Sequence, residues 1–259
     1  MSNSNPFSLQ GKTALINGAS RGIGLAIAKA IAAAGAKTIL ASRSLDQLEK
    51  HASALREQGH AAEALTLDMA DNSSIEIAAG KAGEVDILIN VAGTNIRKKF
   101  QDYTRQEYEH LLQTNLHGIF RLTQLIAAGM IERARGGKIV NIGSLMSVGG
   151  LPYLTVYAIT KSALWGLTRT LAAELGRHNI QANCIAPGFI ITDLNRKMWE
   201  PEFMKTWLKS VQANPRTGTP EDIAPLAVYL SSPGADYVTG QCIAVDGGYT
   251  TTAVWPFEV

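Results

Sequence analysis

The chain has 259 residues, of which 46% are hydrophobic and 18% are charged, and its formal net charge is +2. This composition excludes an intrinsically disordered protein and indicates a large buried core. Positive and negative side chains are scattered in balance, so no strong field of one sign attracts nucleic acid or an anionic membrane. We therefore expect one large domain, 1–259, with a small-molecule substrate and no nucleic-acid or membrane partner.

The N-terminal sequence lacks a basic start followed by an apolar stretch, and no apolar run reaches about 18 residues. We expect an unexported, cytoplasmic protein. Cys184 and Cys242 lie far apart in apolar sequence, so we interpret both as small buried residues rather than a metal pair or a disulfide. The histidines do not show zinc-site spacing, and we expect no metal.

From residue 12 onward, short apolar runs alternate with longer segments of helical period, which is typical of repeated βαβ units. The expected strands are 12–17, 37–41, 62–67, 85–90, 138–143, 180–186 and 241–246. The expected helices are 23–34, 45–58, 105–131, 153–177 and 221–231. Because crossovers between parallel strands are right-handed, the helices should cover both faces of the sheet. The prediction is an α/β protein: a single-domain Rossmann fold with a doubly wound, parallel, seven-stranded sheet.

Gly18, Gly22 and Gly24 follow the first expected strand and lead into a helix. Glycine permits a tight turn and lets backbone N–H groups approach a pyrophosphate at the positive end of that helix. The spacing is GxxxGxG rather than the more common GxGxxG. The strand–turn–helix context nevertheless predicts a dinucleotide site.

The second strand ends in Ser42 and Arg43, where NAD-selective proteins of this architecture place an acid against the ribose 2′-hydroxyl. Arg43 and Arg21 instead offer guanidinium groups to a 2′-phosphate, and Ser42 adds a hydroxyl. Two solvated surface arginines are the alternative interpretation. The predicted cofactor is NADP(H).

Tyr157 and Lys161 have the i, i+4 spacing that places two side chains on one face of a helix. A nearby ammonium favours the phenolate, so this pair predicts a Tyr157 pKa shifted from about 10 toward neutrality and an acid–base role. Chance alone produces such pairs often enough that the spacing is weak evidence by itself.

Polar residues at expected strand ends strengthen this interpretation, since ligands of open α/β sheets bind there. Ser144 ends the fifth strand, and Asn90 and Gly93 close the fourth. Asn115 stands inside a long helix, where asparagine is locally unfavourable, so it either faces water or is retained for function.

Together these residues resemble the short-chain dehydrogenase/reductase family from about Leu9 to Gly248. The quoted landmarks are the NGASRGIG loop, Asp68, Asn90-Val-Ala-Gly93, Asn115, Ser144, Tyr157-xxx-Lys161, Pro187-Gly188 with Thr192, and Val245-Asp-Gly-Gly248. Two positions depart from the family pattern: Asn17 replaces the usual Thr, and Val91 replaces the usual second Asn.

The resemblance implies that Tyr157 exchanges a proton with the substrate oxygen and that Ser144 orients that oxygen. Lys161 would lower the Tyr157 pKa and hold the nicotinamide ribose, while Asn115 would hold a proton-relaying water. Together with the glycine loop and the arginines, the cofactor contacts are expected at Gly18, Ser20, Arg21, Gly22, Ile23, Gly24, Ser42, Arg43, Asp68, Met69, Asn90, Ala92, Gly93, Tyr157, Lys161, Pro187, Gly188, Ile190 and Thr192.

Several stretches are most similar to gluconate 5-dehydrogenase and 2-deoxygluconate 3-dehydrogenase-type members. The expected substrate contacts are Arg97, Ser144, Met146 and Tyr157, and Arg97 would pair with a substrate carboxylate. The alternative for Arg97 is a solvated charge run. Apolar residues around Met146 favour a less polar ketone instead.

In this family the segment near 190–215 forms a lid over the substrate. Met198, Trp199, Phe203 and Trp207 have the spacing of one helix face, which favours lid packing that also shapes specificity. The long helices carrying Asn115 and Tyr157 resemble those that join family members into homotetramers, and a dimer remains open.

The leading hypothesis is an NADP(H)-dependent oxidoreductase that interconverts a secondary alcohol and a ketone, with a gluconate-type substrate. A 3-oxoacyl carrier-protein reductase shares every landmark, although the balanced charge offers little basic surface for an acidic carrier. A non-catalytic NADP(H) sensor is the third possibility, and it would not need Ser144, Tyr157 and Lys161.

Overall fold

The computed structural model describes residues 5–193 and 195–254. Residue 194 of the expected lid, and residues 1–4 and 255–259 of the expected domain, lie outside this part. Seven parallel strands form one sheet in the order β3-β2-β1-β4-β5-β6-β7. They are β1 (Thr13–Asn17), β2 (Lys37–Ser42), β3 (Ala62–Thr66), β4 (Ile87–Asn90), β5 (Gly137–Ile142), β6 (Ile180–Pro187) and β7 (Cys242–Val245). The strand order reverses between β1 and β4, which is where doubly wound sheets bind ligands.

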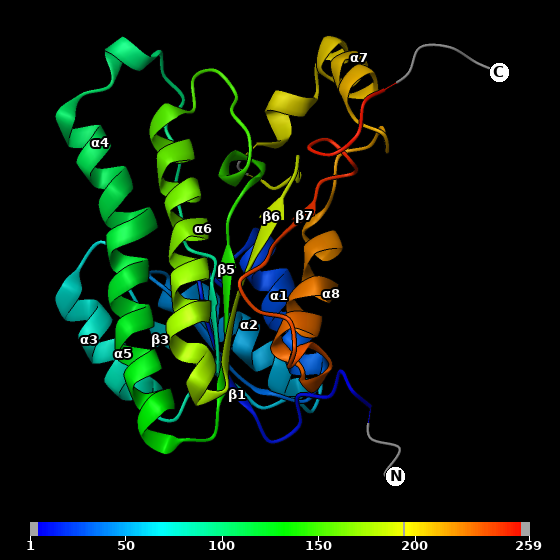
Figure 1. The fold of residues 1–259 in the computed structure, drawn as a ribbon. Coiled ribbons are helices and arrows are strands. Elements are labelled where there is room, and N and C mark those ends of the chain that lie inside the picture. Colours follow the sequence, from blue (N-terminus) through cyan, green and yellow to red (C-terminus); the bar gives the residue numbers. More distant parts are fainter. Residues whose placement is uncertain (1–4, 194, 255–259) are drawn as a thin grey trace.

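Helices cover both faces of the sheet (Figure 1). One face carries α1 (Gly22–Ala33), α2 (Leu45–Glu57) and α8 (Pro220–Ser231), and the other carries α3 (Asn72–Ala82), α5 (Gly118–Arg133) and α6 (Thr155–Leu175). Each face has its own cluster of buried apolar side chains. The central strands are buried on both sides, which explains their nearly continuous apolar sequence, whereas the edge strands β3 and β7 are partly exposed. The predicted fold is confirmed, and each expected strand is found to within one or two residues at its ends.

α3 is not among the helices expected from the sequence, because its segment is short and weakly amphipathic. Its start does carry a local signal: the Asp71 carboxylate accepts a 2.9 Å hydrogen bond from the backbone N–H of Ser73. Such an acidic N-cap is a common way for a helix to begin.

The helix expected at 105–131 is present as three consecutive pieces. These are α4 (Arg105–Leu112), a π-helical stretch (Gln113–His117) and α5. A π stretch inside an α-helix often marks a functional site. Here it contains Asn115, whose side chain is fully buried.

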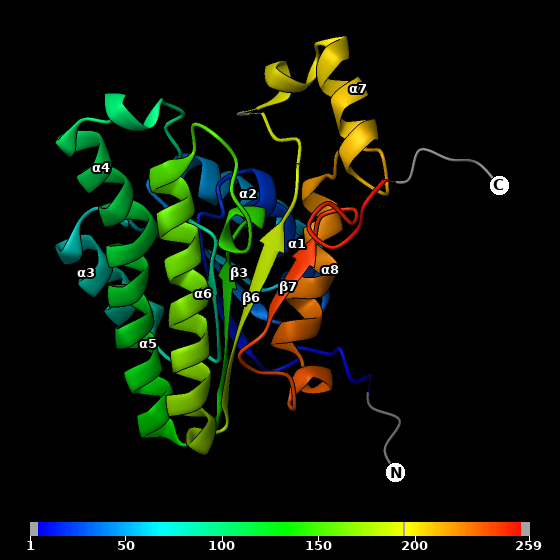
Figure 2. The same cartoon turned by 45° about the horizontal axis from the view of Figure 1, so that its top comes forward.

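The segment after β6 leaves the sheet, as expected for 188–220. It contains a short 3-10 turn (Arg196–Trp199) and α7 (Glu202–Val211), and a bridge between Ile190 and Gly218 joins its two ends. In Figure 2 the arrowheads of β6 and β7 point toward α7, so this segment stands over the carboxyl edge of the sheet. Among the described residues, no helix combines the length and apolarity needed to span a bilayer.

Candidate active site

Tyr157 and Lys161 lie one turn apart on α6, as their spacing predicts. The Lys161 Nζ is 5.7 Å from the centroid of the Tyr157 ring. Lys161 is buried, and its Nζ donates a 2.7 Å hydrogen bond to the carbonyl of Ile142, the last residue of β5. The pair is therefore anchored at the carboxyl edge of the sheet.

Burial controls the protonation of both side chains. It lowers the pKa of Lys161 from 10.5 to about 8, because the charged ammonium is disfavoured away from water. It also raises the pKa of Tyr157 above 10.0, and hydrogen bonding with Ser144 and the positive charge of Arg97 oppose that rise only in part. The expectation of a Tyr157 pKa lowered toward neutrality is therefore corrected, since desolvation of the phenolate outweighs its stabilisation by neighbouring groups.

Ser144 follows β5 and begins a short 3-10 turn. Its Oγ accepts a 3.1 Å hydrogen bond from the backbone N–H of Met146 and lies close enough to Tyr157 to affect that phenol. The adjacent Ser147 Oγ donates a 2.8 Å hydrogen bond to the carbonyl of Lys161. This bond ties the end of β5 to α6, so the structure brings Ser144, Tyr157 and Lys161 together.

Asn115 reaches the same region from the π-helical stretch. Its Oδ1 accepts a hydrogen bond from the backbone N–H of Thr94, and its Nδ2 donates to the carbonyl of the same residue, both at 2.8 Å. A Cβ on Gly93 would lie 3.5 Å from both Asn115 Oδ1 and Lys161 Nζ. Asn115 therefore points inward, and a glycine at 93 leaves room beside the two side chains.

The glycine loop has the backbone geometry that a pyrophosphate site requires. Gly18 and Gly22 have positive φ angles of 76° and 55°, and a Cβ on Gly24 would lie 2.1 Å from the Gly18 carbonyl oxygen. α1 begins after Arg21 without a side-chain cap and without an acidic residue in its first turn. Its first N–H groups therefore suit an anion.

The expected nucleotide-binding side chains lie around this loop. Arg21 and Arg43 are exposed, and Ser42 is half-buried at the end of β2. His51 of α2 contacts the carbonyl of Ser20 through Nε2 at 3.2 Å. His51 was not among the expected site residues, because nothing in its local sequence shows that α2 folds back against the glycine loop.

Asp68 and Met69 follow β3, on the far side of the same edge. Asp68 is half-buried and its Oδ1 accepts a 2.9 Å hydrogen bond from the backbone N–H of Ala70, whereas Met69 is buried. A Cβ on Gly118 would lie 2.1 Å from the Met69 carbonyl oxygen. Close packing against α5 therefore positions this turn.

The side chain of Asn90 forms hydrogen bonds with other buried side chains of the protein. Its Oδ1 accepts a 2.6 Å hydrogen bond from Asn17 Nδ2, and its Nδ2 donates to Thr123 Oγ1 at 3.0 Å and to Asn141 Oδ1 at 2.8 Å. Both amide protons are thus taken. Any contact between Asn90 and a cofactor would come from its backbone.

Asn17, which replaces the usual threonine, supports the loop after β4 with its side chain. Its Oδ1 accepts hydrogen bonds from the backbone N–H groups of Val91 and Ala92, at 2.9 and 2.8 Å. A Cβ on Gly18 would lie 2.8 Å from the nitrogen of Ala92. The loop after β4 is therefore held directly against the glycine loop.

The segment after β6 approaches the glycine loop from the opposite side. A Cβ on Gly188 would lie 2.6 Å from the Cα of Asp246, and a Cβ on Gly22 would lie 3.4 Å from Thr192 Cγ2. Ile190 is buried and Pro187 ends β6. The residues expected at the nicotinamide end are thus brought beside the loop expected at the pyrophosphate.

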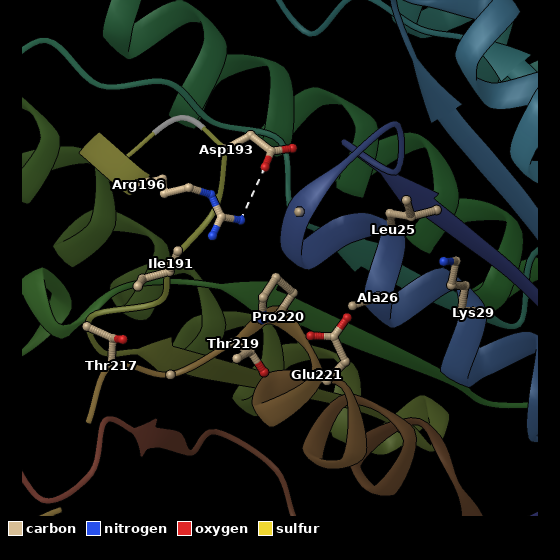
Figure 3. Close-up of a pocket in the computed structure, with 12 residues that line it drawn as sticks. Leu25, Ala26, Lys29, Ile191, Asp193, Arg196, Thr217, Thr219, Pro220 and Glu221 are labelled. Atoms are coloured by element: carbon tan, nitrogen blue, oxygen red, sulfur yellow. Dashed lines mark ion pairs between the residues drawn. The ribbon is translucent and has the colours of Figure 1, made fainter. Parts of the chain in front are cut away.

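A cavity of about 410 Å³ adjoins Gly22 and lies between α1, the 191–196 segment and the start of α8. Figure 3 shows Lys29 and Glu221 lining it, with the Asp193–Arg196 ion pair on the facing segment. The two charged atoms of that pair are 3.5 Å apart. The cavity adjoins the nucleotide end of the site but does not include Tyr157 or Ser144.

Arg97 and Met146 lie on the expected substrate side. Arg97 is exposed, its charge acts on the Tyr157 phenol, and its Nη1 is 2.7 Å from Met198 Sδ. Met146 is buried in an apolar cluster with Leu145. The expected substrate side therefore combines the Arg97 guanidinium with an apolar wall.

Aromatic packing holds the segment over this wall. The Phe189 ring centroid lies 5.2 Å from that of Trp199, 5.4 Å from Trp207 and 4.9 Å from Tyr249. Phe203, however, is 70% exposed. The expected single stripe is therefore corrected, because Trp199 belongs to a separate 3-10 turn and Phe203 faces away from the cluster.

The two cysteines lie side by side in the structure, although they are far apart in the sequence. Cys184 in β6 is paired in register with Cys242 in β7, and both are free thiols. Cys184 is buried but Cys242 is only half-buried. This corrects the interpretation of two separate buried residues, because strand pairing brought together positions that are distant in sequence.

A family model described as enoyl-(acyl carrier protein) reductase matches residues 18–250. Gluconate 5-dehydrogenase of Gluconobacter oxydans (strain 621H) is 37% identical over 256 residues, covering 97% of this chain and 100% of that protein. The 2-dehydro-3-deoxy-D-gluconate 5-dehydrogenase of Bacillus subtilis (strain 168) is 40% identical over 247 residues, covering 94% of this chain and 96% of that protein.

Solved structures agree with these relatives. A gluconate 5-dehydrogenase from Burkholderia cenocepacia J2315, in complex with NADP and tartrate, has a TM-score of 0.92 and 35% identity. The match covers 96% of this chain and 98% of that one. The predicted resemblance is confirmed, and the chain belongs to the short-chain dehydrogenase/reductase family of NAD(P)-dependent oxidoreductases acting on CH–OH groups.

Proposed function

We propose that the protein is an NADP(H)-dependent oxidoreductase that interconverts a secondary alcohol and a ketone in a gluconate-type sugar acid or a related small polar carbonyl compound. The observation that carries the substrate class is the position of Arg97, whose charge reaches the Tyr157 phenol. A guanidinium beside the acid–base group suits a substrate that carries a carboxylate near its reacting carbon. The names of the sugar-acid relatives support the same class.

The residues present fit the cofactor. The uncapped start of α1 and the crowded glycines form a cradle that larger side chains would fill. Arg43 follows β2, where an acid would select NAD, and together with Arg21 of the glycine loop it suits a 2′-phosphate. Solved relatives that carry NADP support this assignment. When bound, the nicotinamide supplies or accepts the hydride at the carbinol carbon.

The protein's own groups handle the proton. Tyr157 donates its phenolic proton to the carbonyl oxygen during reduction and removes it from the hydroxyl during oxidation. Ser144 donates a hydrogen bond to the same oxygen and stabilises the charge that develops there. Lys161 and Asn115 act behind the phenol: the ammonium holds the ribose, and Asn115 holds a water for proton exchange through its backbone, because its amide protons are donated to Thr94 and Thr160.

A less polar ketone is the second candidate substrate. Tyr157 packs against the apolar cluster of Leu145, Met146 and Leu154, which would favour hydrocarbon over hydroxyl groups. A 3-oxoacyl carrier-protein substrate would use the same wall. An assay of these two classes beside sugar acids therefore separates the candidates.

The test is a substrate panel with NADP⁺ or NADPH, comparing sugar acids, neutral polyols and apolar ketones. We expect the highest kcat/KM with a sugar acid, and we expect Arg97→Gln to lower it about tenfold or more through KM, since a charge-assisted contact contributes about 1.5–3 kcal/mol. The neighbouring exposed Lys99→Gln is the matched control. Equal losses for acids and neutral polyols would reject the carboxylate role.

We also propose that the protein forms a homotetramer. Phe120 on α5 and Ile159 on α6 are 52% and 46% exposed, which leaves apolar side chains on this helical face. Light scattering of the purified protein tests this assembly, and a monomer at micromolar concentration contradicts it.

A further inference from the structure

Cys184 and Cys242 occupy registered positions on neighbouring parallel strands. Registered residues point to the same face of the sheet, and neighbouring strands lie about 4.8 Å apart. Disulfides join Cα atoms that are about 4.4–6.8 Å apart, so strand geometry lets these two sulfurs bond. Cys242 lies in the edge strand and is half-buried, whereas Cys184 is fully buried beside it.

The two thiols differ in reactivity. The interaction between the two thiols raises the pKa of Cys184, which burial raises further, and lowers the pKa of Cys242. The thiolate is the nucleophilic form of cysteine. Cys242 is therefore both the more accessible and the more reactive of the two, with a second thiol directly behind it.

Cys184 also lies against the catalytic region. A Cβ on Gly143 would lie 2.7 Å from Cys184 Sγ, so this sulfur packs on the backbone just before Ser144. The positive charge of Lys161 acts on the same thiol. Movement of this sulfur would therefore displace the backbone just before Ser144 and change the surroundings of Lys161.

We propose that Cys184 and Cys242 form an oxidisable dithiol that a hydroperoxide converts into a disulfide, and that this bond lowers turnover by disturbing the backbone beneath Ser144. The Cys242 thiolate attacks the terminal oxygen of the hydroperoxide, an S–O bond forms and the O–O bond breaks, so that an alkoxide leaves, or hydroxide when the oxidant is hydrogen peroxide. The Cys184 sulfur then attacks the Cys242 sulfur, an S–S bond forms, and the oxygen leaves as water with the Cys184 proton. Both sulfurs are oxidised and the peroxide is reduced.

The thiol chemistry is tested on the full-length protein with hydrogen peroxide, followed by alkylation, intact-mass measurement and non-reducing electrophoresis. Wild type should lose two hydrogens, take up no alkylating agent after denaturation and recover both thiols with dithiothreitol. Cys242→Ser should keep a free Cys184. Two free thiols in treated wild type, a product oxidised at Cys242 alone or a disulfide between chains would each overturn the proposal.

The effect on activity rests on the proposed function, whereas formation of the disulfide does not. Oxidised wild type should lose about 10-fold to 100-fold in kcat, since a displacement of about 1 Å near reacting groups can reduce rate about 100-fold. Dithiothreitol should restore it, and Cys242→Ser should be active and peroxide-resistant. A disulfide with unchanged kcat refutes the effect on turnover; no activity before oxidation refutes the proposed function alone.

Discussion

Two polar regions share the carboxyl edge of the sheet, and they are built in opposite ways. In the reaction region, Asn115, Lys161 and Ser144 are only 0%, 3% and 8% exposed. In the nucleotide region, Arg21 and Arg43 are exposed to solvent. Burial therefore sets the proton affinities of the side chains in the reaction region, whereas solvent-screened charges set the affinity for the cofactor in the nucleotide region.

The largest expected effect lies in the reaction region. Tyr157→Phe should lower kcat about 100-fold to 10,000-fold, because it removes the proton carried by the phenol. NADPH affinity, measured by fluorescence titration, should change little because the ring remains. A near-normal kcat with the best substrate would exclude Tyr157 as the acid–base group.

The pH dependence should differ between the two reaction directions. Because the pKa of Tyr157 is raised above 10.0, the phenol is protonated at neutral pH and ready to donate during reduction. Oxidation needs the phenolate, so its kcat/KM should rise about tenfold per pH unit toward alkaline pH. Both profiles are measured with one substrate pair. A plateau of the oxidation profile near neutrality would show instead a lowered pKa.

Lys161→Met should raise stability while removing activity. The folded-state pKa of about 8 against 10.5 disfavours the buried ammonium by about 3 kcal/mol at neutral pH. The lost hydrogen bond to Ile142 offsets about 1 kcal/mol of this, so the free energy of unfolding should rise by about 2 kcal/mol.

The direction in which stability changes with pH follows from proton binding at Lys161. Between about pH 8 and pH 10.5 the unfolded chain holds a proton at Lys161 that the folded protein has released, so wild-type stability should rise with pH in that window. Urea unfolding of wild type, Lys161→Met and the exposed-residue control Lys50→Met measures this. If the free energies of unfolding of wild type and Lys161→Met changed in parallel with pH, the burial of a charged lysine would be contradicted.

In the nucleotide region, Arg43→Ala should weaken NADPH binding about tenfold and leave NADH binding nearly unchanged, because only NADPH carries the 2′-phosphate. Fluorescence titration of both cofactors gives the ratio. Lys50→Ala, an exposed lysine on α2, is the control. An unchanged ratio would assign Arg43 to the solvated surface.

The smallest expected effect is that of salt, which should act on cofactor binding in the nucleotide region but not on turnover in the reaction region. Raising ionic strength from about 0.01 M to about 1 M shortens the screening length from about 30 Å to about 3 Å. NADPH affinity should therefore fall a few-fold, whereas kcat at saturating cofactor should stay constant. A kcat that falls in parallel would mean that the reaction region is more open to solvent than its burial indicates.

Residue spacing predicted the elements that depend on neighbours in sequence. The alternation of strands and helices, the turn glycines and the Tyr157–Lys161 face all follow from local geometry, and each is present in the structure. By contrast, α3 was missed, because tertiary contacts stabilise a segment whose own periodicity is weak.

The sequence by itself determined the fold class, through its alternating apolar and helical periods, and the family, through the resemblance of its motifs; it also placed polar residues at the expected strand ends. Only the tertiary structure decided that Asn90 is occupied inside the sheet, that Cys184 meets Cys242 and that the pKa of Tyr157 rises. The physical reason is that burial, strand register and hydrogen-bond competition depend on residues far apart in the chain, so no local pattern contains them.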